Sequence, residues 1–372
     1  MDLESLILAT TKFGVTDSRD VVYALLHLAN DIDYKGQITT ALTGKPLTFA
    51  ADYSKNPVEL FMEFVEYCIA KSNSFDVICR SWLPLSVARQ LGSRFGSTKV
   101  PSWVGVASCG QQVGDLRLSL GFRRDDLVGK PRGPLYSASH HMELEWQRIA
   151  YVLKVDGFIL GKVQDTSARI IEGTIPEDCL QLLGWEGHFD AGLPDKLWRT
   201  LVANRTSEGR MVPGWYRRAC ALALTKLTSE GDLNIAKLVA DLSQPSTLIE
   251  YLKRVQDVTR NRKFFRCSPG ASIDGNEQGE DILEAAQQGK QDGNSCIIGL
   301  GPRDMVDGDL VCILFGCSVP VILRPLPERW ETDRLHMMLV DAAYVHDYME
   351  GVLFAGLTKD EVHRRSTTFR LL

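Results

Sequence analysis

Apolar residues recur at helical spacing near the start of the chain. Between Asp17 and Ala29 they fall close to one helical face. Asn56 followed by Pro57 and Glu59 is typical of a helix start, because Asn caps, Pro suits the first turn and Glu lies three residues after the cap. The apolar stripe behind this start extends to about residue 70. The pattern therefore predicts two helices in this region.

Short apolar runs of strand type occupy the middle and the last third of the chain. Tyr151–Val155 and Phe158–Val163 flank Asp156-Gly157, a pair that favours a two-residue turn because such turns need positive φ. These two runs therefore predict a β-hairpin. Turns with glycine, proline or polar residues separate the later runs, which are Ile297–Gly299, Leu310–Phe315, Val319–Leu323 and Met337–Val340.

A second helical region lies between these two groups of strands. Its predicted helices are Pro194–Ala203, Pro213–Leu227 and one that opens with the capping box Thr247–Glu250 and ends near Arg260. Strand groups that enclose a helical segment indicate an α+β fold. We predict mixed helices around a small, mostly antiparallel sheet or partial barrel, with strands from the middle and the C-terminal third.

The length of 372 residues fits one large domain or two average ones. We predict one compact α+β domain over residues 1–372, because neither group of strands has enough apolar partners of its own. Its regions are helical (residues 1–80), loop-rich (81–148), strands (149–175), helical (193–262), a mobile acidic insertion (271–295) and C-terminal strands (296–372). The insertion holds six acidic residues and one lysine, so its net charge equals the −5 of the whole chain, and its composition offers no apolar face.

Composition limits the compartment and the partners. The chain is 44% hydrophobic and 24% charged, as globular proteins are, and its negative net charge argues against a nucleic-acid binder. The first residues lack a signal-peptide pattern, and the longest uncharged apolar run, Leu310–Leu323, is too short for a membrane span. Nine cysteines without a C-x-x-C pair are typical of reduced thiols. We predict a cytoplasmic protein that binds neither nucleic acid nor a membrane.

The common motifs for cofactor chemistry are missing from the sequence. It has no phosphate loop G-x-x-x-x-G-K-[ST], no dinucleotide loop G-x-G-x-x-G, no nucleophile elbow G-x-S-x-G and no zinc motif H-E-x-x-H. Phosphate cradles and zinc sites depend on those spacings. We therefore predict no cofactor and no metal.

Six groups of residues, spread in order along the chain, carry a family resemblance. They are Thr16–Leu26, Asp52–Lys55, Val100–Val104, Leu197–Leu201, the C-terminal set Gly299–Pro302, Gly308–Gly316 and Pro320–Pro325, and finally Tyr344–His346. They resemble the patterns "tdpRDkvyALL", "pDYsk", "lPSWvpdW", "fwrTL", "GlGP…GDlvcvl.G…PfvLRp" and "YvHGimdGE" of the fungal heterokaryon incompatibility (HET) family. The resemblance covers nearly the whole chain.

This resemblance is confined to the region that follows the HET domain in that family. The chain has no block like "lSYvWG" or "WiDalCInQ", which mark the HET domain itself. That domain is a Toll/interleukin-receptor-like module and carries the death-inducing activity, so the activity does not carry over. The resemblance implies a fungal, intracellular protein with a non-catalytic role in binding or self/non-self recognition.

Two departures from the family pattern introduce acid–base groups. Where the pattern has "YnAsg", this chain continues into His140 and His141, and in the closing segment Asp347 replaces a glycine after His346. Imidazoles transfer protons near neutral pH, and Asp347 or Glu143 would orient such a ring. Adjacent residues of an extended segment face opposite ways, so only one of His140 and His141 would reach a site. These five residues are the candidate catalytic groups if the protein is an enzyme.

Two functions stay open on the sequence alone. The resemblance favours a binding protein whose partner, a protein or a small molecule, is unknown, and in that case the departures are drift. The alternative is a rebuilt pocket in a cofactor-independent enzyme of fungal secondary metabolism, such as a cyclase, isomerase or hydrolase. A closed cavity with converging acid–base groups would favour the enzyme, and an exposed apolar face would favour the binding protein.

Overall fold

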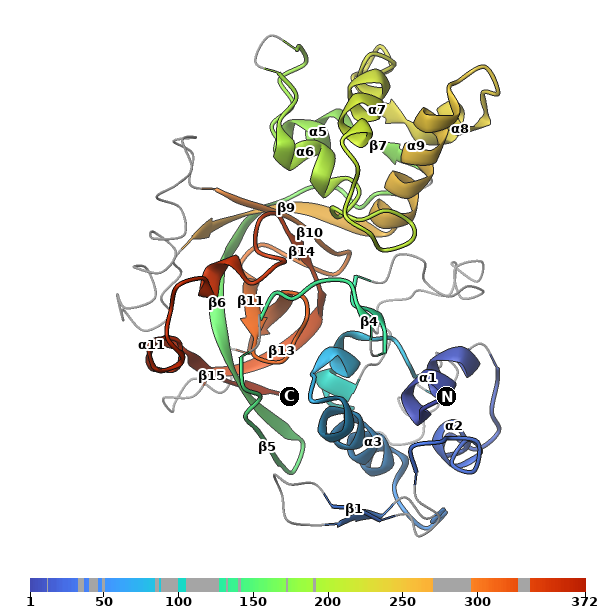
Figure 1. Ribbon diagram of the computed structural model, residues 1–372, viewed down its shortest axis with the longest axis vertical. Coiled ribbons are helices and arrows are strands. Elements are labelled where there is room, and N and C mark those ends of the chain that lie inside the picture. The colour runs from blue at the N-terminus through green and yellow to red at the C-terminus, as the bar shows by residue number, and fades with distance from the viewer. Residues whose placement is uncertain are drawn as a thin grey trace.

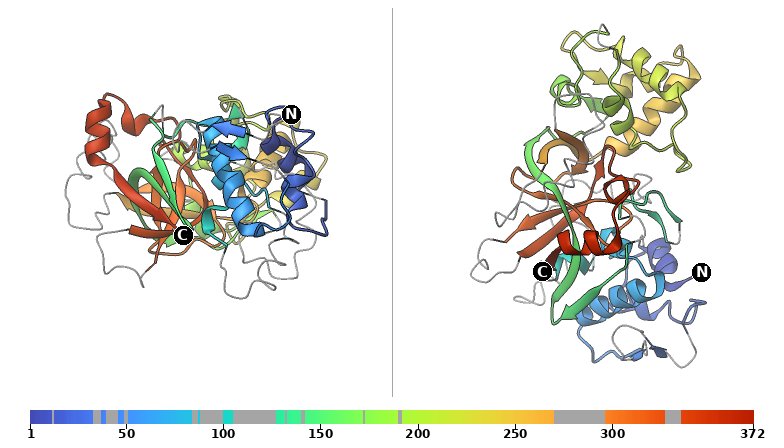
Figure 2. Two further views of the ribbon diagram at one scale, coloured as in Figure 1. Left: turned by 90° about the horizontal axis from the view of Figure 1, so that it is seen from below. Right: turned by 60° about the vertical axis from the view of Figure 1, so that its left-hand side comes forward.

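The computed structural model shows three regions in contact: N-terminal helices, a central sheet and a second group of helices (Figures 1 and 2). The sheet lies between the two helical regions. The structure describes residues 1–11, 13–32, 37–39, 46–48, 51–83, 87, 100–104, 127–131, 133–139, 142–171, 173–189, 192–269, 296–326 and 335–372. The predicted acidic insertion 271–295 lies outside these residues.

The N-terminal region is helical, as predicted. Its elements are α1 (Leu3–Thr10), α2 (Asp20–Tyr23), α3 (Pro57–Ser72) and the 3-10 turns η1 (Asp76–Cys79) and η2 (Ser102–Val104), beside a small ladder of β1 (Gln37–Thr39) and β2 (Pro46–Thr48). Asn56 caps α3 by accepting a hydrogen bond from the Val58 amide at 2.9 Å, which confirms the predicted start. The helix predicted from Asp17 to Ala29 is shorter, because the amides of Leu25 and Leu26 bond three residues back and tighten the chain into turns.

Nine strands of the described chain form the central sheet. They are β5 (Trp146–Ile149), β6 (Val152–Thr166), β9 (Arg262–Pro269), β10 (Ile297–Pro302), β11 (Leu310–Leu314), β12 (Val321–Pro325), β13 (Leu335–Ala342), β14 (Tyr344–Val345) and β15 (Thr367–Leu371). β6 pairs with both β11 and β15, and β12 and β13 connect those two, so these five strands close a barrel. β9, β10 and β14 extend the sheet from the second half of β6. The predicted α+β fold with a partial barrel is confirmed, although the sheet is larger than predicted.

The hairpin predicted at Asp156-Gly157 is wrong, because β6 runs through this pair without a turn. Gly157 lies opposite Leu314 of β11 and Thr367 of β15, and a Cβ atom there would overlap the carbonyl oxygen of Ile313. The glycine therefore serves a close approach of two strands, a role that the local pattern does not distinguish from a turn. The actual hairpin joins β5 to β6 one step earlier, where Ala150 has a φ of 54°.

The second helical group is inserted between two neighbouring strands of the sheet. The chain leaves at the end of β6 and returns at β9, after β7 (Thr174–Ile175), α5 (Glu177–Leu182), α6 (Asp195–Thr200), α7 (Trp215–Leu224), β8 (Leu233–Asn234), α8 (Ile235–Ala240) and α9 (Ser246–Thr259). The helices predicted in this region are confirmed as α6, α7 and α9. The capping box predicted at Thr247 is wrong, because α9 begins one residue earlier behind Pro245 and no side chain caps it.

Two apolar clusters hold these regions together. The larger extends from the N-terminal helices across one face of the sheet to the inserted helices, with Trp82, Leu153 and Tyr251 among its fully buried members. The smaller covers the other face, where Phe354 of η5 (Val352–Phe354) meets Phe158 and Phe315 edge to face, and it includes Val362 of α11 (Lys359–Arg365). The continuous larger cluster suits one folding unit, which stays a prediction. Within the described ranges, no helix has the length and apolarity needed to cross a membrane.

Candidate functional site

The five residues proposed from the sequence are not all described by the structure. His140 and His141 lie outside the described residues. Glu143 has an exposed carboxylate that pairs with Lys359 at the start of α11, and this hydrogen bond lowers the pKa of Glu143. Glu143 is therefore engaged at the surface with a lysine and does not orient an imidazole of the described residues.

His346 and Asp347 follow the short strand β14 and form a pair. Nε2 of His346 lies 3.4 Å from Oδ1 of Asp347, and Nδ1 lies 3.5 Å from the hydroxyl of Tyr344. The His346 amide donates to the carbonyl of Ile298 at 2.9 Å, which fixes the start of the turn to β10. The hydroxyl of Tyr344 thus joins the His346–Asp347 pair, whose role as a site stays a prediction.

A cluster that the sequence did not suggest lies at the junction of the sheet and the inserted helices. We call it the Arg205 cluster; its members are Tyr136, Arg205, Tyr344 and Glu350. The guanidinium carbon of Arg205 lies 4.4 Å from the ring centre of Tyr136, and the rings of Tyr136 and Tyr344 are 6.2 Å apart. Glu350 forms an ion pair with Nη2 of Arg205. The turn after β14 thus carries both the His346–Asp347 pair and the carboxylate that reaches Arg205.

Backbone geometry fixes the position of the Arg205 guanidinium. Ala203 and Asn204 both adopt left-handed conformations, with φ of 48° and 50°. The hydroxyl of Tyr136 donates to the carbonyl of Ala203, and Nε of Arg254 donates to the carbonyl of Arg205 at 2.8 Å. Non-glycine residues hold such conformations only where their surroundings over-determine them. The arginine is therefore presented by a strained and well-anchored turn.

Both phenols of the cluster are held neutral by their surroundings. Burial raises the pKa of Tyr136, and the nearby Arg205 and Arg254 oppose that rise. Burial also raises the pKa of Tyr344, and the negative charges of ionised Tyr136 and Asp347 would raise it further. Neutral phenols donate hydrogen bonds and give the arginine an aromatic face. The cluster therefore places the Arg205 cation beside two neutral phenols.

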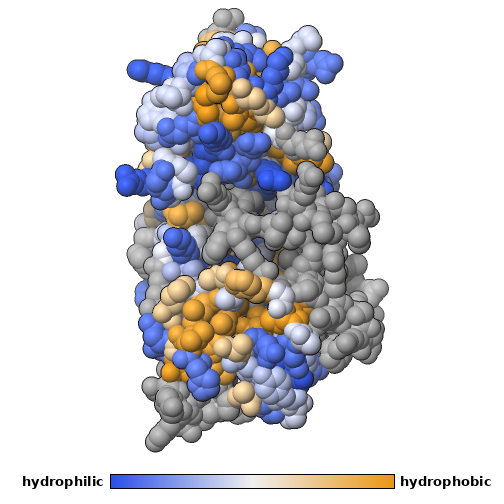
Figure 3. All heavy atoms as spheres, turned by 90° about the vertical axis from the view of Figure 1, so that its right-hand side faces the viewer, coloured by the Kyte–Doolittle hydropathy of each residue, from blue (hydrophilic) through white to orange (hydrophobic). Residues whose placement is uncertain are grey.

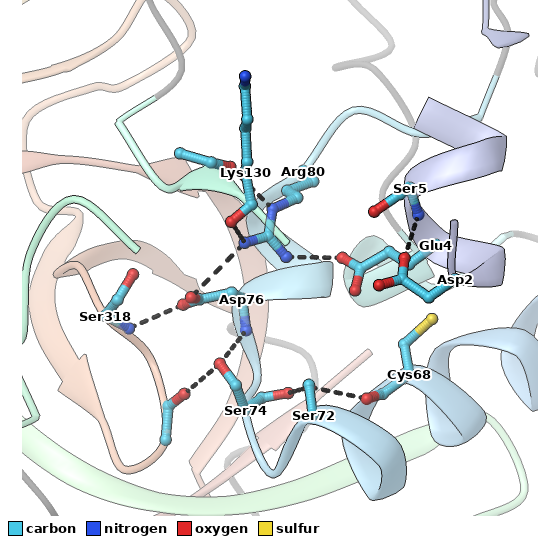
Figure 4. Close-up of polar contacts among 12 residues, drawn as sticks. Asp2, Glu4, Ser5, Cys68, Ser72, Ser74, Asp76, Arg80, Lys130 and Ser318 are labelled. Carbon is cyan, nitrogen blue, oxygen red and sulfur yellow. Dashed lines mark hydrogen bonds and ion pairs between the residues drawn. The ribbon is translucent and has the colours of Figure 1, made fainter. Parts of the chain in front are cut away.

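A second ionic cluster joins the N-terminal helices to the sheet (Figure 4). Nη1 of Arg80 lies 2.6 Å from Oε1 of Glu4, and Nη2 lies 3.7 Å from Oδ2 of Asp76. The Ser318 amide donates to Oδ1 of Asp76 at 2.8 Å. Burial raises the pKa of both carboxyls, and Arg80 opposes the rise. All three side chains are buried, so this cluster connects elements of the fold and offers no open position to a ligand.

Segments that carry the family resemblance contact one another in pairs. Arg324 binds both carboxylate oxygens of Asp309, at 2.8 and 2.9 Å. The hydroxyl of Tyr53 donates to Asp20 at 2.6 Å, and the guanidinium of Arg19 lies 5.3 Å from the Tyr53 ring centre. The Arg205 cluster likewise joins the segment at Tyr136, the chain that follows Leu197–Leu201 and the closing segment.

A group of metal ligands or a known relative would also indicate a function. Among the residues that the structure describes, no three His, Cys, Asp or Glu side chains are grouped so that they could hold a metal ion. Comparison of the chain with protein-family models, with curated proteins and with solved structures gave no match. The function must therefore be inferred from the residues themselves.

Proposed function

We propose that this chain is a non-catalytic recognition protein of the HET type, corresponding to the region that follows the HET domain. The observation that carries the proposal is that residues of the motif segments, or of the chain next to them, pair with one another. Asp309 with Arg324, Asp20 with Tyr53, and Tyr136 with Arg205 each join two segments of the resemblance or of their immediate continuation. Their contacts are structural, as expected for residues that define a fold.

The backbone at position 347 supports the same assignment. Asp347 has a φ of 68°, a conformation that glycine adopts freely and that aspartate tolerates better than most residues. The family pattern has a glycine at this position. Aspartate at position 347 therefore keeps the backbone conformation of the turn. The alignment of the closing segment with the family pattern agrees with this conformation.

A binding role is supported by the surface of the N-terminal helices. Met1, Phe13 and Leu28 expose more than 60% of their surface, at 62%, 68% and 66%. Figure 3 shows apolar side chains gathered on the lower half of this side of the molecule. Patches of exposed apolar side chains are typical of protein contact sites.

Deletion of the gene in a filamentous fungus that carries it tests the proposal. A recognition protein predicts that the deletion changes the outcome of heterokaryon tests against a panel of strains while the profile of secondary metabolites stays the same. Reintroduction of the wild-type gene is the control. An unchanged heterokaryon outcome together with the loss of one metabolite would refute the proposal and favour an enzyme.

The His346–Asp347 pair favours a second candidate function, a cofactor-independent enzyme. A carboxylate beside an imidazole that also contacts a hydroxyl is the arrangement of a general acid–base group. If the protein turns over a metabolite identified by the deletion, His346→Ala should lower turnover by about 10²-fold or more. His188→Ala is the matched control, since His188 is exposed and lies 4.0 Å from Glu186. Equal activity of both variants would exclude His346 from catalysis.

A further inference from the structure

All the hydrogen-bond donors of Arg205 have partners, and most of these partners are backbone carbonyls. A guanidinium has five N–H donors. Nε and Nη2 donate to the carbonyl of Leu135 at 2.9 and 2.8 Å, and Nη1 donates to the carbonyl of Asn204 at 3.1 Å and to the sulfur of Met211 at 2.6 Å. The remaining donor, on Nη2, goes to Glu350. One N–H of Arg205 is therefore paired with an anion, the carboxylate of Glu350.

The group that takes this donor is held much less firmly than the arginine. The side chain of Arg205 is 6% exposed, whereas that of Glu350 is 43% exposed. Glu350 makes one contact with the guanidinium, from the turn that follows β14. Met211, which is 57% exposed, lies against Nη1 of the same guanidinium. The anion position is thus open to solvent and has an apolar side chain beside it.

We propose that Glu350 is the resident occupant of a carboxylate-binding position on Arg205, and that an acidic side chain of a protein partner replaces it. We expect the ligand to be a carboxylate as well, because the carboxylate of Glu350 accepts from the one donor that the carbonyls and Met211 leave over. The exposed Met211 side chain would pack against an apolar residue beside the acidic side chain of the partner. The inference rests on the proposed recognition function and assigns a contact to it.

Electrostatics around the position favour an anion from outside. The positive charges of Arg205, Arg254 and Arg262 lower the pKa of the Tyr136 hydroxyl, and the negative charge of Glu350 raises it. The strained turn at Ala203 and Asn204 keeps the guanidinium in place when Glu350 moves away. Preorganised donors of this kind favour binding, since little order is lost on association.

Chemical rescue of Glu350→Ala tests the proposal. The variant leaves a buried arginine without its carboxylate, so its Tm should fall. Sodium acetate or N-acetylglutamate amide should then raise that Tm by about 2 °C or more above sodium chloride at equal ionic strength, because a ligand of the folded state stabilises it. The double variant Arg205→Gln/Glu350→Ala should show no such difference.

Two results would overturn the proposal. They are equal effects of acetate and chloride on Glu350→Ala, and the same acetate effect in the double variant. If Glu350→Ala does not fold, titration of the wild type with N-acetylglutamate amide, followed at the Arg205 Nε–H signal by NMR, replaces it. Saturable shifts support the proposal and their absence refutes it. If these tests fail but the gene deletion still changes the heterokaryon outcome, the recognition function is supported and only this contact is refuted.

Discussion

Two buried arginines, Arg80 and Arg205, connect the regions of this molecule in different ways. Arg80 has two carboxylate partners, Glu4 and Asp76, and both are buried with it. Arg205 has one carboxylate partner among the described residues, Glu350, and that partner is half exposed. A fully buried ionic group exchanges with nothing, so Arg80 holds the fold. Arg205 has a counterion that faces solvent, which is the arrangement that the proposed exchange of Glu350 for a partner's carboxylate requires.

Replacement of Arg80 should have the largest effect on stability. Arg80→Leu leaves two buried carboxyls without a counterion and should lower the free energy of unfolding by about 3–5 kcal/mol. Urea unfolding followed by tryptophan fluorescence measures this loss. Arg364→Leu, at an exposed position of α11, should unfold like the wild type. A loss for Arg80→Leu below about 1 kcal/mol would mean that its cluster is not buried in solution.

Removal of Glu350 should cost less than removal of Arg80. Water replaces a half-exposed carboxylate to some extent, so Glu350→Ala should lower the free energy of unfolding by about 1–2 kcal/mol. Glu350→Gln keeps a hydrogen-bond acceptor and should lose roughly half as much. Measurement in acetate-free buffer is essential if acetate binds at the vacated position. Losses as large as that of Arg80→Leu would erase the distinction between the two arginines.

The pH dependence of stability should show the burial of Glu4 in the Arg80 cluster. Burial raises the pKa of Glu4 above its ordinary value of 4.5, so the folded protein binds this proton more tightly than the unfolded chain. That contribution is present at low pH and is lost as the pH rises from 4.5 through the raised folded pKa, at up to about 1.4 kcal/mol per pH unit. Glu4→Gln cannot titrate there, so its free energy of unfolding should fall less across this window. Parallel curves for the two proteins from urea unfolding at pH 4–8 would contradict the raised pKa.

The smallest effect on stability is expected for the exposed ion pair of Glu143 and Lys359. Both side chains are mostly in solvent, where ion pairs add little to stability. Glu143→Ala should therefore leave the midpoint of thermal unfolding unchanged within error. A clear drop, measured by calorimetry, would show that this pair secures α11 to the sheet more firmly than its exposure indicates.

Local signals in the sequence predicted the elements whose cause is local. Asn56 and Pro57 begin α3 as expected, because capping depends on neighbours in sequence. The C-terminal strands also follow from their apolar runs. Asp156-Gly157 misled the prediction because the reason for its glycine is a strand that arrives more than 150 residues later, at Ile313.

The candidate site was only partly predictable for the same reason. His346 and Asp347 are neighbours and were recognised as a pair. Arg205 and Glu350 are 145 residues apart and neither belongs to a local pattern with chemical meaning. Their contact arises from the junction of the sheet with the inserted helices. Pairings of this kind can be found only once the fold is known.

The insertion of α5–α9 between β6 and β9 has a consequence for the order in which the chain assembles. During synthesis β6 emerges early and meets β5 at once, but its other partners, β9, β11 and β15, follow only after the inserted helices or later. Pairing over such separations is slow, because a long loop must close before any contact forms. The barrel closes last, when β15 fits between β6 and β13. Until then β6 exposes an unpaired strand edge, so a chain released before β15 should aggregate through it.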